Sequence, residues 1–122
     1  MATFFSGPGT APVYLQIDRR ERGSAAVYVC RGSFSLATHV QLDELVDRVR
    51  SEEAGRIVLD LSEVKHIDSV GVGTLAMLLK HTMATSRSLV LVGGEAIREV
   101  LAASSLDTAF RFVSSLDAAF AD

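Results

Sequence analysis

RIVLDLSEVKHIDSVGVGTLAMLLKH, residues 56–81, is the stretch that decides the fold of this chain. It opens with a β-branched and aliphatic run at 57–61, which is typical of a strand covered on both faces. A turn is expected after this strand. From Val72 onward the apolar residues recur at helix spacing, so the chain is predicted to change from a buried strand to an amphipathic helix.

The turn, residues 68–73 (DSVGVG), places two good helix caps next to each other. The short side chains of Asp68 and Ser69 can each accept hydrogen bonds from the free N–H groups of a first helical turn. We therefore expect the Ser69 hydroxyl at the positive end of a helix dipole, just past a strand. A phosphoryl group there, with about −1.5 to −2 charges, would be stabilised by the helix but would crowd Asp68 and any acidic partner surface. The physical alternative is that Ser69 only caps the helix.

Seven further elements are expected around this strand and helix. An apolar alternation followed by an apolar run predicts a β-hairpin, with residues 19–24 (RRERGS) at its tip and residues 33–35 as a short polar connection after it. Ser114 and Asp117 resemble a capping box for a last helical turn. The elements are strands at 13–17 and 25–30, a helix at 42–49, a strand at 89–92, a helix at 95–104, a strand at 110–113 and that last turn.

Strands that alternate with helices call for parallel pairing and helices packed on the sheet. Because the first two strands form an antiparallel hairpin, the predicted class is an α/β single domain with a mixed five-stranded sheet and about four helices. A chain of 122 residues is long enough for one core and too short for two. Residues 1–11 are small and rich in Gly and Pro, and they predict a flexible N-terminal arm before a domain at 12–122.

Composition excludes several classes of protein. The net charge of −3 gives no basic excess to neutralise a phosphate backbone, so nucleic acid is not expected as a partner. Cys30, the single cysteine, lies in an apolar run and predicts a buried thiol in a reducing compartment. No apolar run approaches the ~20 residues of a membrane span, and the start of the chain lacks the pattern of a signal peptide. A cytoplasmic protein without direct membrane insertion is predicted.

Little in the chain suggests catalysis. Residues 71–76 fit the G-x-G-x-x-A form of a dinucleotide fingerprint, but they do not follow the strand directly and too little chain remains for the second half of that fold. Residues 67–71 approach a nucleophile elbow, but Ile67 stands where the elbow needs a small residue. His39, His66 and His81 lack metal-ligand spacing. We predict neither a metal, a cofactor nor an enzymatic activity.

The run at 57–80, placed after a hairpin and a helix and followed by SLVLVGG and LAASSLD, resembles the STAS-domain family. The likeness is to the small stand-alone anti-sigma factor antagonists of bacteria, and it covers nearly the whole chain from Val13 on. Its most specific part is the D-S-x-G element at residues 68–71. In that family the serine after the aspartate is phosphorylated by a partner that is both anti-sigma factor and serine kinase. The resemblance therefore implies Ser69 as the acceptor.

The resemblance implies a switch. Unphosphorylated family members bind the anti-sigma factor and free a sigma factor, phosphorylation abolishes binding, and a PP2C-type phosphatase restores it. ATP and Mg²⁺ then belong to the kinase, so this chain needs no cofactor. The implied partner-binding residues are Asp68, Ser69, Val70, Gly71, Val72, Gly73 and Thr74, with Ser33 and Ser35.

One departure from the family pattern lies after the second strand. Where the family often has Gly-Glu-hydrophobic-Asp, this chain has Gly-Ser-Phe-Ser at 32–35, so both acidic positions are serine. The change removes negative charge near Ser69 and is expected to alter partner choice. Two other classes stay open: an accessory subunit of a membrane transporter, in which Ser69 is not phosphorylated, and a module that binds a nucleotide or lipid in the crevice by Ser69.

Overall fold

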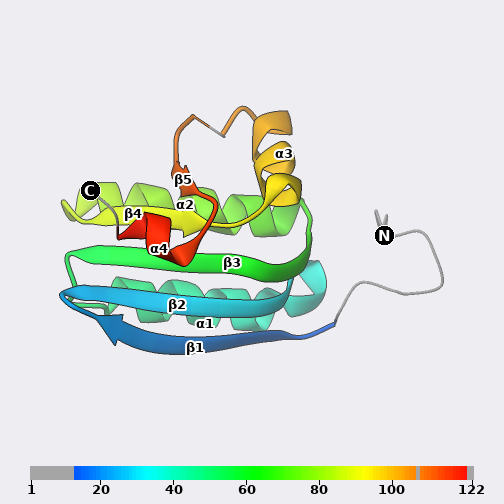
Figure 1. Cartoon of the computed structure of the whole chain (residues 1–122). Helices are drawn as coiled ribbons and strands as arrows, with labels where there is room; N and C mark the ends of the chain where they lie inside the picture. The colour runs from blue at the N-terminus through cyan, green and yellow to red at the C-terminus, as the bar shows by residue number, and fades with distance from the viewer. Residues whose placement is uncertain (1–12, 107, 121–122) are drawn as a thin grey trace.

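The computed structural model describes residues 13–106 and 108–120, which form one sheet with helices packed on it (Figure 1). The predicted N-terminal arm at 1–11 lies outside the described residues. The elements are β1 (Leu15–Arg22), β2 (Ala25–Phe34), the 3₁₀ turn η1 (Leu36–Thr38), α1 (His39–Arg50), β3 (Arg56–Ile67), α2 (Ser69–Ala84), β4 (Ser88–Val92), α3 (Glu95–Ala103), β5 (Arg111–Val113) and α4 (Leu116–Ala119). The predicted order of strands and helices is confirmed.

The strands lie in the order β1-β2-β3-β4-β5, so β3 is central. β1 pairs with β2 antiparallel, and the other neighbouring pairs are parallel. The mixed five-stranded sheet with four helices is therefore confirmed. In Figure 1, α1 and α2 lie side by side behind the sheet, and α4 lies in front of it. Because α1 and α2 each connect two parallel strands, their first turns meet at the carboxyl ends of those strands.

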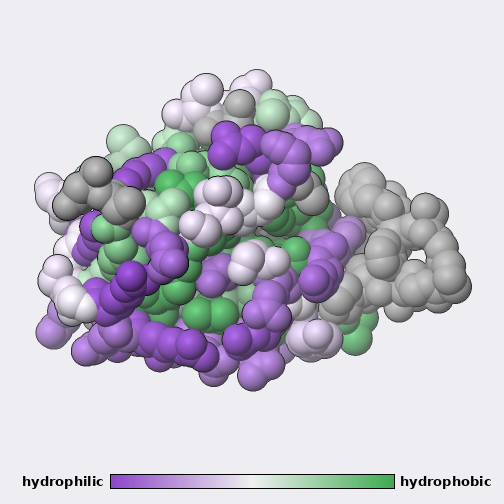
Figure 2. Space-filling model, viewed as in Figure 1, coloured by the Kyte–Doolittle hydropathy of each residue, from purple (hydrophilic) through white to green (hydrophobic). Residues whose placement is uncertain are grey.

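Two apolar clusters fill the space on the two faces of the sheet. The larger one joins alternate residues of β1 to β4 to the inner sides of α1 and α2 and to Ile97 and Leu101 of α3. The smaller one packs five sheet valines against α4, with Ala119 fully buried. Figure 2 shows this second face, with hydrophilic residues along the lower border where β1 lies and hydrophobic residues in the middle.

The central strand is longer than its apolar run. β3 continues to Ile67, so the predicted turn after residue 61 is wrong, and α2 begins at Ser69 rather than near Val72. Residues 63–67 extend the parallel pairing with the end of β2. Val64 and Ile67 point into the larger cluster while Glu63 and Lys65 are exposed, so this half of the strand is covered on one face. Val64 and Ile67 are three residues apart, so this stretch lacks the strict alternation that predicts a strand from sequence.

The hairpin turn is shorter than predicted. β1 runs through Arg22, and Gly23 and Ser24 form the turn, with Gly23 at φ +61° in the left-handed region that glycine tolerates. The arginines expected at a solvated tip therefore lie in the strand. Arg22 reaches α4, where its Nη1 lies 3.5 Å from Asp117 Oδ1 and its guanidinium lies 4.2 Å from the centre of the Phe120 ring.

Two smaller predictions also need correction. Ser33 is the last residue but one of β2, and it is not part of a polar connection. At the C-terminal end the helix cap is Ser115 and not Ser114, because Ser115 Oγ accepts a hydrogen bond of 3.1 Å from the Ala118 N–H. In both cases the sequence placed a polar residue one position away from its structural role.

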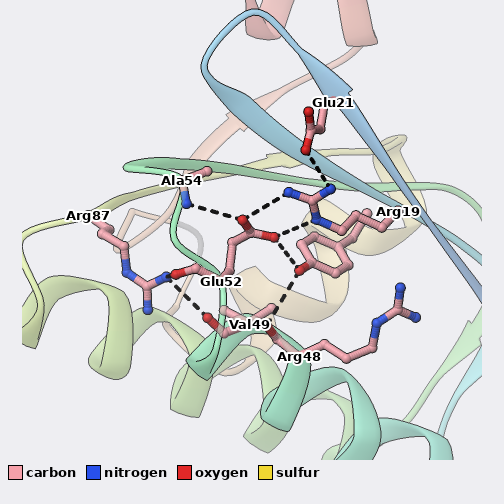
Figure 3. Close-up of polar contacts among 8 residues, drawn as sticks. Arg19, Glu21, Arg48, Val49, Glu52, Ala54 and Arg87 are labelled. Atoms are coloured by element: carbon pink, nitrogen blue, oxygen red, sulfur yellow. Dashed lines mark hydrogen bonds and ion pairs between the residues drawn. The ribbon is translucent and has the colours of Figure 1, made fainter.

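A buried carboxylate holds the amino end of β3 to the hairpin (Figure 3). Glu52 Oε1 accepts hydrogen bonds of 2.6 Å from Arg19 Nε and from Tyr28 Oη. Its Oε2 accepts from Arg19 Nη2 at 3.0 Å and from the Ala54 N–H at 3.1 Å. The Glu52 side chain is only 5% exposed. These bonds, those from Arg19 first, lower the pKa of Glu52 from 4.5 to about 2.

The Glu52 cluster predicts a pH-dependent stability. Because the folded pKa of Glu52 lies below its unfolded value, the stabilisation is present above pH 4.5 and is lost as the pH falls toward 2. We expect wild type to exceed Glu52→Gln in free energy of unfolding by on the order of 2 kcal/mol near neutral pH, and this difference to shrink in acid. Urea unfolding of both proteins at several pH values measures it. The exposed neighbour Glu53→Gln is the control, and a difference that stays constant with pH would contradict the assignment.

Candidate functional site

Two turns that are far apart in the sequence lie side by side at the carboxyl ends of β2 and β3. The Asp68 N–H donates to the Phe34 carbonyl at 3.1 Å. The Leu36 N–H in turn donates to Asp68 Oδ2 at 3.1 Å. These two bonds join the start of η1 to the start of α2, so the turn that carries Ser69 is fixed by the end of β2.

The cap of α2 is Asp68 and not Ser69. Asp68 Oδ1 accepts hydrogen bonds from the Val70 N–H at 2.9 Å and from the Gly71 N–H at 3.1 Å, while its backbone is extended. One carboxylate thus serves three backbone donors. Such a cap contributes roughly 1 kcal/mol of helix stability, and the negative charge also suits the positive end of the helix dipole.

Ser69 is the first residue of α2, and its side chain is exposed. Among the residues that the structure describes, none forms a hydrogen bond with its hydroxyl. The alternative that Ser69 caps the helix is therefore wrong, since Asp68 already takes the N–H groups that a cap would bind. The hydroxyl is free to react with an external group without loss of a contact within the domain.

At Gly71 the backbone of α2 lies directly against the backbone of β2. A Cβ built on Gly71 would lie 2.2 Å from the Phe34 carbonyl oxygen and 2.7 Å from the Phe34 Cβ. No side chain fits there. The first turn of α2 therefore packs directly on the backbone of β2, and Gly71 sets the distance between Ser69 and the end of that strand.

The predicted partner-binding residues separate by exposure. Ser69 and Gly73 are exposed, and Asp68 and Val70 are partly buried. The remaining residues of the α2 start are buried, including Gly71, Val72 and Thr74, whose Oγ1 donates to the Val70 carbonyl at 3.0 Å. Fewer residues are therefore exposed at the start of α2 than the predicted partner-binding set contains.

Ser33 and Ser35 come to the same end of the sheet as Ser69, but both are buried. Thr38 holds their backbone, since its Oγ1 donates to the Ser33 carbonyl at 2.8 Å and accepts from the Ser35 N–H at 3.1 Å. Their side chains do not lie on the surface that a partner would meet. They can influence Ser69 only through the shape of the η1 turn.

The sequence analysis did not identify two exposed apolar residues in the segment that follows β2. Leu36, whose N–H donates to Asp68, is 50% exposed, and Val40, four residues later at the start of α1, is 61% exposed. Sequence spacing assigned the apolar face of α1 to Leu42, Leu45, Val46 and Val49, all of which are buried. Leu36 and Val40 fall outside that face, and large apolar side chains that are exposed next to a functional turn are typical of a contact surface.

The other candidate groups give no second site. Cys30 is buried, as predicted, and burial raises the pKa of its thiol to about 12. In residues 13–106 and 108–120, no three His, Cys, Asp or Glu side chains converge as they would around a metal ion. None of the described helices is long and apolar enough to cross a membrane.

A model of the STAS domain matches residues 16–119 of the chain. This chain belongs to the STAS domain family. The matched range runs from β1 to the end of α4 and includes the Asp68 cap and Ser69.

Several characterised STAS proteins are similar to this one. The anti-sigma-F factor antagonist RsfB of Mycobacterium tuberculosis is 27% identical over 107 residues, which cover 88% of each chain. An anti-sigma factor antagonist from Mycobacterium paratuberculosis has a crystal structure that superposes with a TM-score of 0.81 at 24% identity, covering 90% of this chain and 94% of that one.

The anti-sigma factor antagonist SpoIIAA, a Bacillus cell fate determinant, has a similar fold. Its unphosphorylated form superposes with a TM-score of 0.66 at 15% identity, covering 85% of this chain and 93% of that one. Its phosphorylated form gives 0.62 at 17% identity, covering 86% and 96%. The fold class inferred from the sequence is thus the fold of these proteins.

Proposed function

We propose that this STAS domain is an anti-sigma factor antagonist whose binding is controlled by phosphorylation of Ser69. The observation that carries the proposal is the exposed Ser69 hydroxyl, which makes no hydrogen bond to the described residues and stands beside a carboxylate that caps α2. The similarity to RsfB, an anti-sigma-F factor antagonist, over 88% of the chain supports the class of partner. That SpoIIAA has been solved in phosphorylated and unphosphorylated forms supports this kind of control.

Charge is the means by which phosphorylation acts in this proposal. A phosphoserine brings about −1.5 to −2 charges to a surface that already carries the Asp68 carboxylate. Since the capping bonds come from Asp68, the modified Ser69 leaves the start of α2 in place. The domain stays folded, and the added charge repels an acidic partner surface that docks on the turn, or must be desolvated at a free-energy cost under an apolar one.

The partners are those that the resemblance to the family implies. The anti-sigma factor supplies the kinase activity with its own ATP and Mg²⁺, and a PP2C-type phosphatase returns Ser69 to its free hydroxyl. The chain is a substrate and binding module in the cytoplasm and has no catalytic role of its own. The contact surface at this end comprises Ser69, Gly73 and the exposed parts of Asp68 and Val70, while Ser33 and Ser35 act through the η1 turn.

Binding of the two charge states tests the proposal. Wild type, Ser69→Ala and Ser69→Glu are used to capture proteins from the host lysate, and the anti-sigma factor is then purified and titrated with each variant by calorimetry. We expect Ser69→Ala to bind like wild type and Ser69→Glu to bind at least about tenfold more weakly, because a charge is placed in the interface. Incubation of the anti-sigma factor with ATP is expected to phosphorylate wild type and not Ser69→Ala.

The control is Ser114→Glu, which adds the same charge at an exposed serine between β5 and α4. It is expected to bind like wild type. Equal binding by Ser69→Ala and Ser69→Glu would contradict control by charge at Ser69. Equal capture of transporter subunits by both would replace the antagonist function with that of a transporter accessory subunit.

A further inference from the structure

A groove runs between the C-terminal halves of α1 and α2, farther along α2 than the turn that carries Ser69. It encloses a cavity of about 260 Å³. Its walls combine apolar and cationic side chains, and those of Arg50, Met77 and Lys80 are long. The lining residues are Val46, Arg50, Met77, Lys80, His81 and Ala84.

The apolar part of the groove is open to solvent. Val46 is buried at its floor, whereas Met77 is 55% exposed at its wall. Exposure of a large apolar side chain costs free energy that burial under a partner recovers. Methionine also adapts its shape to an inserted side chain, as it does in many protein-binding surfaces.

The polar groups of the groove lack partners of opposite charge. Within the described part of the chain, neither Arg50 nor Lys80 forms an ion pair, whereas Arg19, Arg22 and Arg31 of the sheet do. The Nε2 atom of His81 is buried and has no hydrogen-bond partner there. Because this atom is closed to solvent, a docked group does not reach it, and the charged groups of the groove open to a partner are those of Arg50 and Lys80.

The acidic residues of α1 do not line this cavity. Asp43, Glu44 and Asp47 are exposed, but the groove between the helices contains cationic and apolar groups alone together with His81. A segment that enters the groove therefore meets positive charge. Carboxylates can pair with the two exposed cations through charge-assisted hydrogen bonds.

The groove and Ser69 belong to one stripe of α2. Ser69, Gly73, Met77, Lys80 and Ala84 are exposed and succeed one another at spacings of three or four residues, which places them on one helix face. Lys80 lies eleven residues after Ser69, which corresponds to about 16 Å along the helix axis. A protein interface of ordinary size, about 800 Å² per partner, covers both positions at once.

We propose that the α1–α2 groove docks an acidic segment of the anti-sigma factor, with one apolar side chain packed on Met77 and with carboxylates paired to Lys80 and Arg50. The inference rests on the proposed function, whose partner it shares. It adds a second contact, remote from the phosphorylation site, that holds the partner by charge attraction and apolar burial. Ser69 then controls one end of an interface whose other end stays unchanged on phosphorylation.

The test uses the purified anti-sigma factor and two groove variants with matched controls. Lys80→Glu and Met77→Ala are expected to weaken binding about tenfold each, since the first replaces attraction by repulsion and the second removes the apolar contact. Lys65→Glu, at an exposed lysine of β3, and Met83→Ala, at a methionine of α2 that is 68% exposed outside the groove, are expected to bind like wild type. Calorimetry at low and high salt should show a weaker salt dependence for Lys80→Glu than for wild type.

The outcomes separate the two proposals. If Ser69→Glu loses binding while Lys80→Glu and Met77→Ala bind within about twofold of wild type, the groove is not part of the interface and this inference alone is overturned. If no anti-sigma factor binds wild type, both proposals fall. Sedimentation of wild type and Lys80→Glu tests the other occupant, because self-association that Lys80→Glu abolishes would make the groove a contact between two copies of this chain.

Discussion

Replacement of Gly71 by alanine is expected to destabilise the domain by more than about 3 kcal/mol. The added Cβ would lie 2.2 Å from the Phe34 carbonyl oxygen, which is too short for a carbon and an oxygen that are not bonded to each other. Both atoms belong to backbone that is held in place, since the same carbonyl accepts from the Asp68 N–H. The first turn of α2 must therefore shift away from β2, with loss of core contacts and of the cap. Gly71→Val adds two more carbons and is expected to prevent folding.

The matched control is Gly73→Ala, two residues farther along the same helix. A Cβ on Gly73 meets no atom within 4 Å, so this substitution is expected to leave stability unchanged or to raise it by up to about 1 kcal/mol through helix propensity. Chemical denaturation of wild type, Gly71→Ala and Gly73→Ala, followed by far-UV circular dichroism, measures both effects. Equal stability of Gly71→Ala and Gly73→Ala would show that β2 and α2 are not packed as described.

The strong apolar periods of the chain were sufficient to predict its architecture. The run at 57–61 and the helix spacing after it are both found, because a strand covered on two faces and an amphipathic helix leave distinct patterns. The second half of β3 escaped because Ser62, Glu63 and Lys65 are exposed there. Its strand conformation depends on pairing with β2, a tertiary contact that no local pattern encodes.

The candidate site was predictable in position and not in detail. The sequence placed Asp68 and Ser69 at a helix start beyond a strand, and the structure confirms this. It could not decide which of the two caps the helix, because both side chains have an oxygen at a suitable distance and only the backbone conformation selects one. The hydrogen bond from Leu36 to Asp68 could not be predicted from the sequence, because it joins two turns that lie 32 residues apart.

Removal of the Asp68 side chain is expected to affect both stability and partner binding. Asp68→Ala leaves the N–H groups of Val70, Gly71 and Leu36 without their acceptor. At about 1 kcal/mol for each bond, the free energy of unfolding should fall by about 2–3 kcal/mol. Urea denaturation measures this loss, with Asp43→Ala on the exposed face of α1 as the control. Because the η1 turn loses its side-chain bond to α2 and only the backbone bond from residue 68 to Phe34 remains, binding of the anti-sigma factor should weaken as well.

Asp68→Asn separates the two roles of this carboxylate. An amide oxygen in place of Oδ1 still accepts from Val70 and Gly71, but the amide nitrogen in place of Oδ2 faces the Leu36 N–H, so two donors oppose each other. We therefore expect a loss of about 1 kcal/mol or slightly more, with helix α2 intact and the contact to η1 broken. If Asp68→Asn binds the anti-sigma factor as wild type does while Asp68→Ala does not, the cap alone positions Ser69 for its partner. Weak binding by both would mean that the joined turns form a single recognition surface, in which Leu36 lies under the partner together with Ser69.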